Sequence, residues 1–205
     1  MRNYINTNDL SDSVIFNNVK AIIDIENWTD YWASEIFVAN GDWYSSFFVN
    51  NTEAFKSYSP NLKWKFVLWD LAYSQGIGYN ECSAAYNSLY DAIISPIKPN
   101  IYTPLFQSLL KNKGFKAYFI NRFADLLNYN WKTEKINAAI DANVNSMASE
   151  ITPNYDRWDP GCSTYCPVNY TEWLQEVEKL KLFYTQRPSY EREQINSVFN
   201  LNGEV

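Results

Sequence analysis

Residues 63–70 read Lys-Trp-Lys-Phe-Val-Leu-Trp-Asp, a run of aromatic and aliphatic residues that is typical of a β-strand. Residues 48–56 form a similar run, and the Ser, Tyr, Pro and Asn residues at 57–61 favour a turn between the two. We therefore expect a β-hairpin with strands at 48–56 and 63–69. The second strand would end directly before Asp70, which would give that carboxylate a rigid support.

Apolar residues at helical spacing dominate the chain before and after this hairpin. Before it, we expect a short helix at 11–20 and a longer one that ends at Asn40-Gly41, with its apolar face at Trp28, Trp32, Ile36 and Phe37. After it, the pattern predicts a loop at 73–80, a helix at 83–94 and a helix from a Thr103 cap to Leu110.

The second half of the sequence repeats this helical pattern. We expect a helix with Phe115, Phe119, Phe123 and Leu126 on one face, and another, after a Thr133 cap, with a core-facing stripe at Ile136, Ile140, Val144 and Met147. Residues 152–168 are predicted to be a loop, and residues 173–184 and 195–199 carry helical stripes. The expected fold class is mainly α with a small β-hairpin, an α+β fold.

Length and composition limit the kinds of partner. The chain has 205 residues and a net charge of −6, with its basic residues scattered, so we expect one domain and no nucleic-acid partner. No apolar run is long enough for a membrane span, and the first 20 residues lack the order of a signal peptide. The abundance of Asn, Tyr and Trp indicates an extracellular or cell-surface location.

Three cysteines add a second indication of the compartment. Cys162 and Cys166 lie in a loop rich in turn residues, so they form either a local disulfide in an oxidising compartment or two free thiols. Cys82 stands alone. A zinc site is disfavoured, because the chain has no histidine and only three thiols.

Two acidic residues follow predicted elements and have amide residues between them. Asp42 lies in Asn40-Gly41-Asp42-Trp43, Asp70 follows 28 positions later, and Asn50 and Asn51 lie between. Carboxylate and amide oxygens suit Mg²⁺ or Mn²⁺, which usually accompany a phosphate substrate. The alternative is that Asp42 is an ordinary turn residue and that Asp70 caps a loop.

Several motifs occur in an order that resembles the spore coat protein H (CotH) kinase family. The resemblance covers residues 19–200 and includes Ile-Asp-x-x-Asn-x-x-Asp-Tyr-Trp at 23–32, Asn-x-Asp-Trp at 40–43 and the strand at 63–70. It continues through Phe-Ile-Asn-Arg at 119–122 to Arg-Pro-Ser-Tyr at 187–190. The resemblance implies an atypical protein-kinase-like fold, of which the chain would supply the portion similar to the C-terminal lobe.

The same resemblance implies roles for the acidic and amide residues. Asp42 matches the family's catalytic acid, and Asp70 matches its metal-binding acid, with Asn50 or Asn51 as the amide ligand. The implied cofactors are ATP with Mg²⁺ or Mn²⁺, and the implied partners are a nucleotide and a protein acceptor with a Ser or Thr hydroxyl.

The chain departs from the family pattern at two points. Family members commonly have a second acid two residues after the metal-binding one, where this chain has Ala72. The family also has a nucleotide-clamping lobe before the matched portion, and no Gly-rich loop precedes residue 20 here. We therefore expect residues 1–205 to be a partial domain without that lobe.

Two classes of function follow from these observations. The first is an atypical ATP-dependent protein kinase that phosphorylates Ser or Thr of a surface or coat protein. The second is a non-catalytic pseudokinase or binding module of a secreted protein, which engages carbohydrate or a protein partner through exposed aromatic residues.

Overall fold

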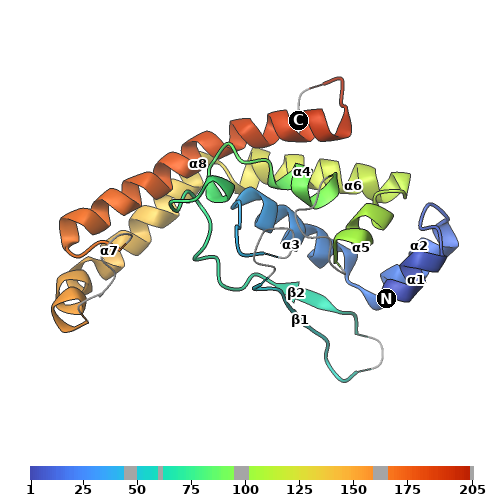
Figure 1. The fold of residues 1–205 in the computed structure, drawn as a ribbon, viewed down its shortest axis with the longest axis horizontal. Helices are drawn as coiled ribbons and strands as arrows, with labels where there is room; N and C mark the ends of the chain where they lie inside the picture. The colour runs from blue at the N-terminus through green and yellow to red at the C-terminus, as the bar shows by residue number, and fades with distance from the viewer. Residues whose placement is uncertain (44–49, 60–61, 95–101, 159–165, 204–205) are drawn as a thin grey trace.

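The computed structural model describes residues 1–43, 50–59, 62–94, 102–158 and 166–203 of the chain. This part of the chain is mostly helical, with one antiparallel pair of short strands (Figure 1). The strands are β1 (Glu53–Phe55) and β2 (Lys65–Val67), and the helices are α1 (Arg2–Thr7), α2 (Ser13–Ile22), α3 (Ile25–Phe37), α4 (Ser88–Ile93), α5 (Tyr102–Leu109), α6 (Lys113–Asp125), α7 (Thr133–Arg157) and α8 (Tyr170–Phe199). The predicted mainly α fold with a small hairpin is therefore confirmed.

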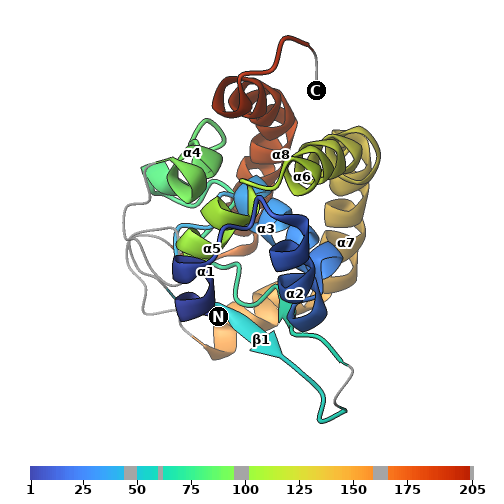
Figure 2. The same cartoon turned by 90° about the vertical axis from the view of Figure 1, so that its right-hand side faces the viewer.

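Helix α3 is the centre of the structure. It begins at Asp24, whose carboxylate accepts a hydrogen bond from the backbone N–H of Asn27 at 3.2 Å. Trp28 and Trp32 are fully buried on α3 and pack on Phe106 of α5, with ring centroids 5.2 and 4.2 Å from it. Figures 1 and 2 place α3 between α8 above and the hairpin below. These aromatic contacts explain why the helix is apolar over most of its surface.

The hairpin is attached to α3 through side chains. The Asn27 side chain pairs with the Phe66 backbone as a neighbouring strand would: it accepts from the N–H at 2.7 Å and donates to the C=O at 3.2 Å. Asp24 forms an ion pair with Lys65 at 3.3 Å. Phe66 is the buried residue of β2 and lies against Tyr31, with ring centroids 5.3 Å apart. A two-stranded sheet needs such support, because it is marginal by itself.

Both strands are shorter than the sequence predicts. Residues 48–49 of the first predicted strand lie outside the described residues, and β1 begins only at Glu53 because Asn51 has a φ of +51°. The second strand ends at Val67 instead of Trp69, because β1 offers no further pairing partner. The hairpin itself and its antiparallel pairing are as predicted.

Helices α7 and α8 form a long antiparallel pair that extends away from α3 (Figure 1). The predicted loop at 152–168 is wrong in its first part, since α7 continues through Pro153 to Arg157. The predicted cap is also wrong: Thr133 is the first residue of α7, and its hydroxyl donates to the Tyr184 carbonyl at 3.1 Å. That carbonyl has no N–H partner in α8 because Pro188 occupies the position four residues later.

The predicted core-facing stripe of α7 is only partly correct. Ile136, Ile140 and Val144 are partly buried, whereas Met147 is 46% exposed, and no residue of α7 is fully buried. Among the described elements, the helix packs mainly on α8. The faces of α6 are buried as predicted, at Phe115, Phe119 and Phe123.

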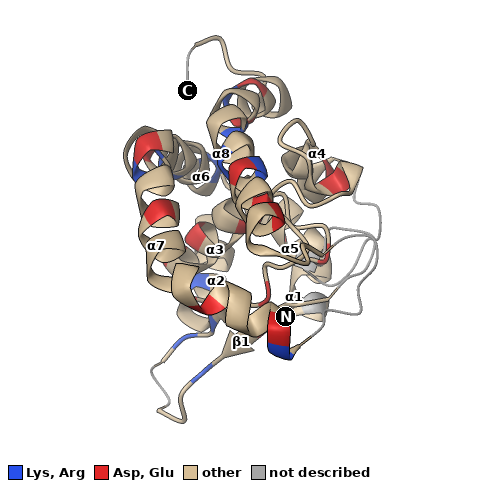
Figure 3. Ribbon diagram, turned by 90° about the vertical axis from the view of Figure 1, so that its left-hand side faces the viewer, with Lys and Arg blue, Asp and Glu red and all other residues tan. Residues whose placement is uncertain are grey.

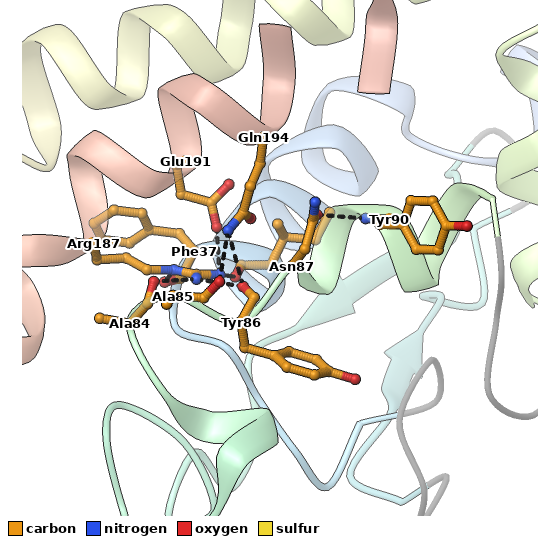
Figure 4. Close-up of polar contacts among 10 residues, drawn as sticks. Phe37, Ala84, Ala85, Tyr86, Asn87, Tyr90, Arg187, Glu191 and Gln194 are labelled. Carbon is orange, nitrogen blue, oxygen red and sulfur yellow. Dashed lines mark hydrogen bonds and ion pairs between the residues drawn. The ribbon is translucent and has the colours of Figure 1, made fainter. Parts of the chain in front are cut away.

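A buried arginine fastens α8 to the rest of the molecule (Figure 4). The Arg187 guanidinium donates to four backbone carbonyls at 2.7 to 2.9 Å, those of Ile36, Phe37, Ala84 and Tyr86. Glu191, one turn further along α8, forms an ion pair with it, and both side chains are fully buried. The Arg187 side chain therefore joins three segments that are distant in sequence. We call this set of contacts the Arg187 clamp.

Candidate functional site

The loop that follows α3 holds Asp42 through its neighbour Asn40. The Asn40 side-chain oxygen accepts from the Asp42 backbone N–H at 2.9 Å, and its amide donates to the Glu35 carboxylate at 2.9 Å. Asn40 and Glu35 are buried. The direction of the Asp42 backbone is therefore fixed by a polar chain that begins inside α3.

Glu35 is an unusual residue for the buried face of a helix. Burial raises its pKa to about 7, and hydrogen bonds from Asn40 and Tyr31 offset part of this effect. Tyr31 in turn accepts a hydrogen bond from Trp43 Nε1 at 2.9 Å, and burial and the nearby Glu35 raise its own pKa. The four residues Tyr31, Glu35, Asn40 and Trp43 form a buried polar network directly behind Asp42.

Gly41 brings the segment after Asp70 against the Asp42 loop. Its N–H donates to the Tyr73 carbonyl at 2.8 Å. A Cβ atom at position 41 would lie 2.8 Å from both the Cys82 sulfur and the Tyr73 ring, so a larger residue would push these segments apart. Burial raises the pKa of the Cys82 thiol to about 12, which leaves this free cysteine unreactive.

The structure joins Asp42 to one of the two predicted amides. Asn51 Nδ2 donates to Asp42 Oδ2 at 2.9 Å, whereas the neighbouring Asn50 is exposed. The second carboxylate oxygen of Asp42 is buried and accepts no hydrogen bond within the described part of the chain. A buried carboxylate oxygen without a donor is suited to a cation or to the proton of a hydroxyl group.

Asp70 lies apart from this pair. It is exposed, three residues beyond the end of β2, and its backbone has a φ of +49°. Its carboxylate accepts from the Ala72 N–H at 3.3 Å and, among the described residues, makes no hydrogen bond with Asp42 or Asn51. The predicted support at a rigid strand end is therefore wrong, because the strand stops earlier.

The described residues contain no group of three or more His, Cys, Asp or Glu side chains placed to hold a metal ion. By the resemblance, a metal ion here would rely on Asp70 and on the Asn51 side-chain oxygen, two residues that make no contact with each other in the described part of the chain. This oxygen-only donor set fits Mg²⁺ or Mn²⁺ and does not fit Zn²⁺.

A family model described as CotH kinase protein matches residues 1–190. The chain belongs to the CotH kinase family. The match begins at residue 1, earlier than the motifs at 19–200 indicate, and it includes both acidic residues and Asn51. Searches of curated proteins and of solved structures gave no significant match. None of the described helices has the length and apolar character needed to cross a membrane.

Several motif residues that resemble the CotH family serve the framework of the structure. Asp30 and Arg122 form a two-point ion pair between α3 and α6, at 2.6 and 2.9 Å. Asn27 holds β2, and Arg187 forms the clamp on α8. The shared order of motifs therefore records mainly how the elements are joined.

The sequence pattern missed the supporting residues Glu35 and Tyr31. The sequence does contain a signal for Glu35, because this acid lies among Trp32, Ile36 and Phe37 on the apolar face of a predicted helix. A buried acid needs a hydrogen-bond partner, so its position indicates a buried polar contact.

Only one cysteine of the predicted disulfide can be described. Cys166 is disulfide-bonded, whereas Cys162, the partner that the sequence predicts, lies outside the described residues. Cys82 is free.

Proposed function

We propose that this chain is an atypical protein kinase that transfers phosphate from ATP to a Ser or Thr hydroxyl of a surface or coat protein. Its helical body would correspond to the C-terminal lobe of a kinase. The observation that carries the proposal is the Asp42 carboxylate: one oxygen is held by Asn51, and the other is buried without a donor among the described residues. Membership of the CotH kinase family supports the same reaction class.

In this proposal Asp42 orients the acceptor hydroxyl and takes up its proton through the oxygen that Asn51 leaves free. Asn51 fixes the carboxylate rotamer, and the Glu35–Asn40 pair fixes the backbone below it. Asp70 and the Asn51 oxygen would hold Mg²⁺ or Mn²⁺, which when bound neutralises phosphate charge. Trp43 and Tyr31 keep water from the inner side of the loop.

Calorimetric titration with a non-hydrolysable ATP analogue, with and without Mg²⁺, tests the proposal. Asp70→Asn should abolish metal-dependent binding, whereas Asp42→Asn should keep binding and lose phosphate transfer. Asp125→Asn, which changes an exposed carboxylate on α6, is the matched control and should behave as the parent protein. Metal-dependent binding that survives in Asp70→Asn would refute the assigned metal ligand.

A second function is favoured by the outer side of the hairpin. Phe55 and Trp69 are 54% and 58% exposed and, with Val67, line a hollow of about 410 Å³. Aromatic side chains in such a hollow stack on sugar rings. A carbohydrate-binding module would bind soluble polysaccharide in the absence of nucleotide, and Trp69→Ala should lose that binding. If Asp42→Asn still binds the polysaccharide, the carbohydrate-binding function is independent of the proposed kinase site.

A further inference from the structure

A cleft of about 670 Å³ lies at the beginning of α3, opposite to the end that carries Asp42. Its walls come from α2, α3, α6 and the segment that leads into β2. Three lysines line it, one from α2 and two from the hairpin: Lys20, Lys63 and Lys65. We call it the lysine cleft.

The lysine cleft carries positive charge on a protein of net charge −6. Lys65 is neutralised by Asp24 at 3.3 Å, but Lys20 and Lys63 form no ion pair within the described part of the chain. Of the two acids at the cleft, Asp24 is thus already paired, and the other, Glu26, is exposed. Figure 3 shows basic residues on the hairpin, the element that supplies Lys63 and Lys65 to the lysine cleft. Three lysines against two acids leave the lysine cleft with a net charge of +1, which favours an anionic ligand.

The floor of the lysine cleft is aromatic. Phe16 and Phe115 pack against each other with centroids 6.1 Å apart, and Tyr118 beside them is 37% exposed. Lys20 Nζ lies 5.9 Å from the Phe16 ring centroid, so charge and aromatic surface adjoin. Leu62, 47% exposed, extends the apolar surface on the hairpin side. A ligand that fits must combine negative charge with an apolar or aromatic group.

We propose that the lysine cleft docks an acidic segment of the acceptor protein that carries an aromatic residue among its carboxylates. The inference rests on the proposed kinase function, because it assigns the docked segment to the phosphate acceptor. The aromatic residue packs on Phe16 and Tyr118, and the carboxylates pair with Lys20 and Lys63.

The position of the lysine cleft sets a spacing for the acceptor sequence. Helix α3 has 13 residues, which corresponds to about 20 Å between the cleft and the Asp42 loop. An extended peptide covers that distance in about six residues. The acidic and aromatic segment should therefore lie at least about six residues from the Ser or Thr that is phosphorylated.

Direct binding to the complete 205-residue chain, without ATP, tests the proposal. The probe is a short fluorescein-labelled peptide with a central Phe flanked by Asp residues and without Ser or Thr, followed by fluorescence anisotropy. The double variant Lys20→Gln/Lys63→Gln should bind it about tenfold more weakly, or about 1.4 kcal/mol. Replacing Phe by Ala in the peptide, or raising the salt concentration, should also weaken binding.

The matched control is Lys56→Gln/Lys132→Gln, which removes the same charge from exposed positions outside the lysine cleft and should bind as the parent does. Asp42→Asn should also bind normally, so a failed kinase assay and a failed docking assay are distinguishable. Three outcomes would overturn the proposal. The Lys20→Gln/Lys63→Gln variant could bind the peptide as tightly as the parent protein does, or the parent could bind a Lys-flanked peptide as tightly as the Asp-flanked one. Millimolar inorganic phosphate alone could also displace the peptide.

Discussion

Glu35 is the residue that couples the candidate site to pH. In the folded chain its pKa is about 7, against 4.5 for the free side chain, because it is buried. Between these values the folded state holds a proton that the unfolded state has lost, so stability falls as pH rises through this window, by about 3 kcal/mol in all. Above about pH 7 Glu35 is ionised in both states, and the full loss of stability is reached.

Glu35→Gln removes this cost and keeps an oxygen for Asn40. We expect the variant to gain stability relative to the parent as pH rises from about 5 to about 8, measured by urea unfolding at both pH values. Burial also raises the pKa of Glu191, but that residue is present in both proteins, so their difference isolates Glu35. A matched change at the exposed Glu134 should give no such trend, and a pH-independent difference would contradict a buried, neutral Glu35.

Asn51 and Asn50 are a natural pair for comparison, since they are adjacent and only Asn51 contacts Asp42. We expect Asn51→Ala to lose about 1 kcal/mol of stability and more than about tenfold in Mg²⁺-dependent nucleotide affinity. Asn50→Ala should change neither quantity. Calorimetric titration of the two variants measures the difference, and equal losses would show that the contact with Asp42 has no special role.

The spacing of residues predicted part of the site. Asp42 and Asn51 were both proposed from their position between predicted elements, and the structure joins them. The choice of Asn51 over Asn50 depends on a left-handed backbone at Asn51, and the network around Glu35 depends on burial in the folded chain. The backbone conformation of Asn51 belongs to no local pattern. The apolar neighbours of Glu35 indicate its burial but not the partners that it meets in the folded chain.

At the scale of elements, the backbone of Phe66 in β2 depends on one side chain of α3. Asn27→Ala would leave the Phe66 N–H and C=O without partners, which costs about 1–3 kcal/mol. We expect faster hydrogen exchange at Phe66 and its neighbours in β2, with α8 little affected. Asn143→Ala, at an exposed position on α7, is the control. Unchanged exchange at Phe66 would mean that the other contacts of β2, such as the Asp24–Lys65 ion pair, hold it without Asn27.

Helix boundaries were less predictable than helices. Periodicity correctly located α3 and α6, because each buries a regular face. The Thr103-Pro104 pair correctly indicated α5, but Thr103 lies inside the helix, which begins at Tyr102, and does not cap it. The sequence pattern failed at the end of α7, where Pro153 and polar residues suggested a loop, although proline only removes one hydrogen bond from a helix whose carbonyls face water. It also assigned a capping role to Thr133, whose hydroxyl instead serves the carbonyl that Pro188 leaves unpaired on α8.

At the scale of the molecule, the Arg187 clamp holds together α3, the segment before α4, and α8. Arg187→Lys cannot reach four carbonyls, because lysine has one nitrogen and no planar fork. We expect the free energy of unfolding, measured by urea unfolding, to fall by about 3–5 kcal/mol. Part of this loss reflects the buried Glu191, which would be left without its partner. Arg157→Lys, at an exposed site on α7, should lie within about 0.5 kcal/mol of the parent. A similarly small loss at Arg187 would contradict the clamp.

The clamp also bears on how the protein is made. Arg187 binds carbonyls at Ile36 and Phe37, 151 and 150 positions earlier in the chain. These carbonyls close the helix that leads directly into the Asp42 loop. A ribosome that has synthesised the first half of the chain has therefore released α3 and Asp42 without the residue that fastens them. The Asp42 loop should therefore reach its final form only late in translation, after α8 has emerged.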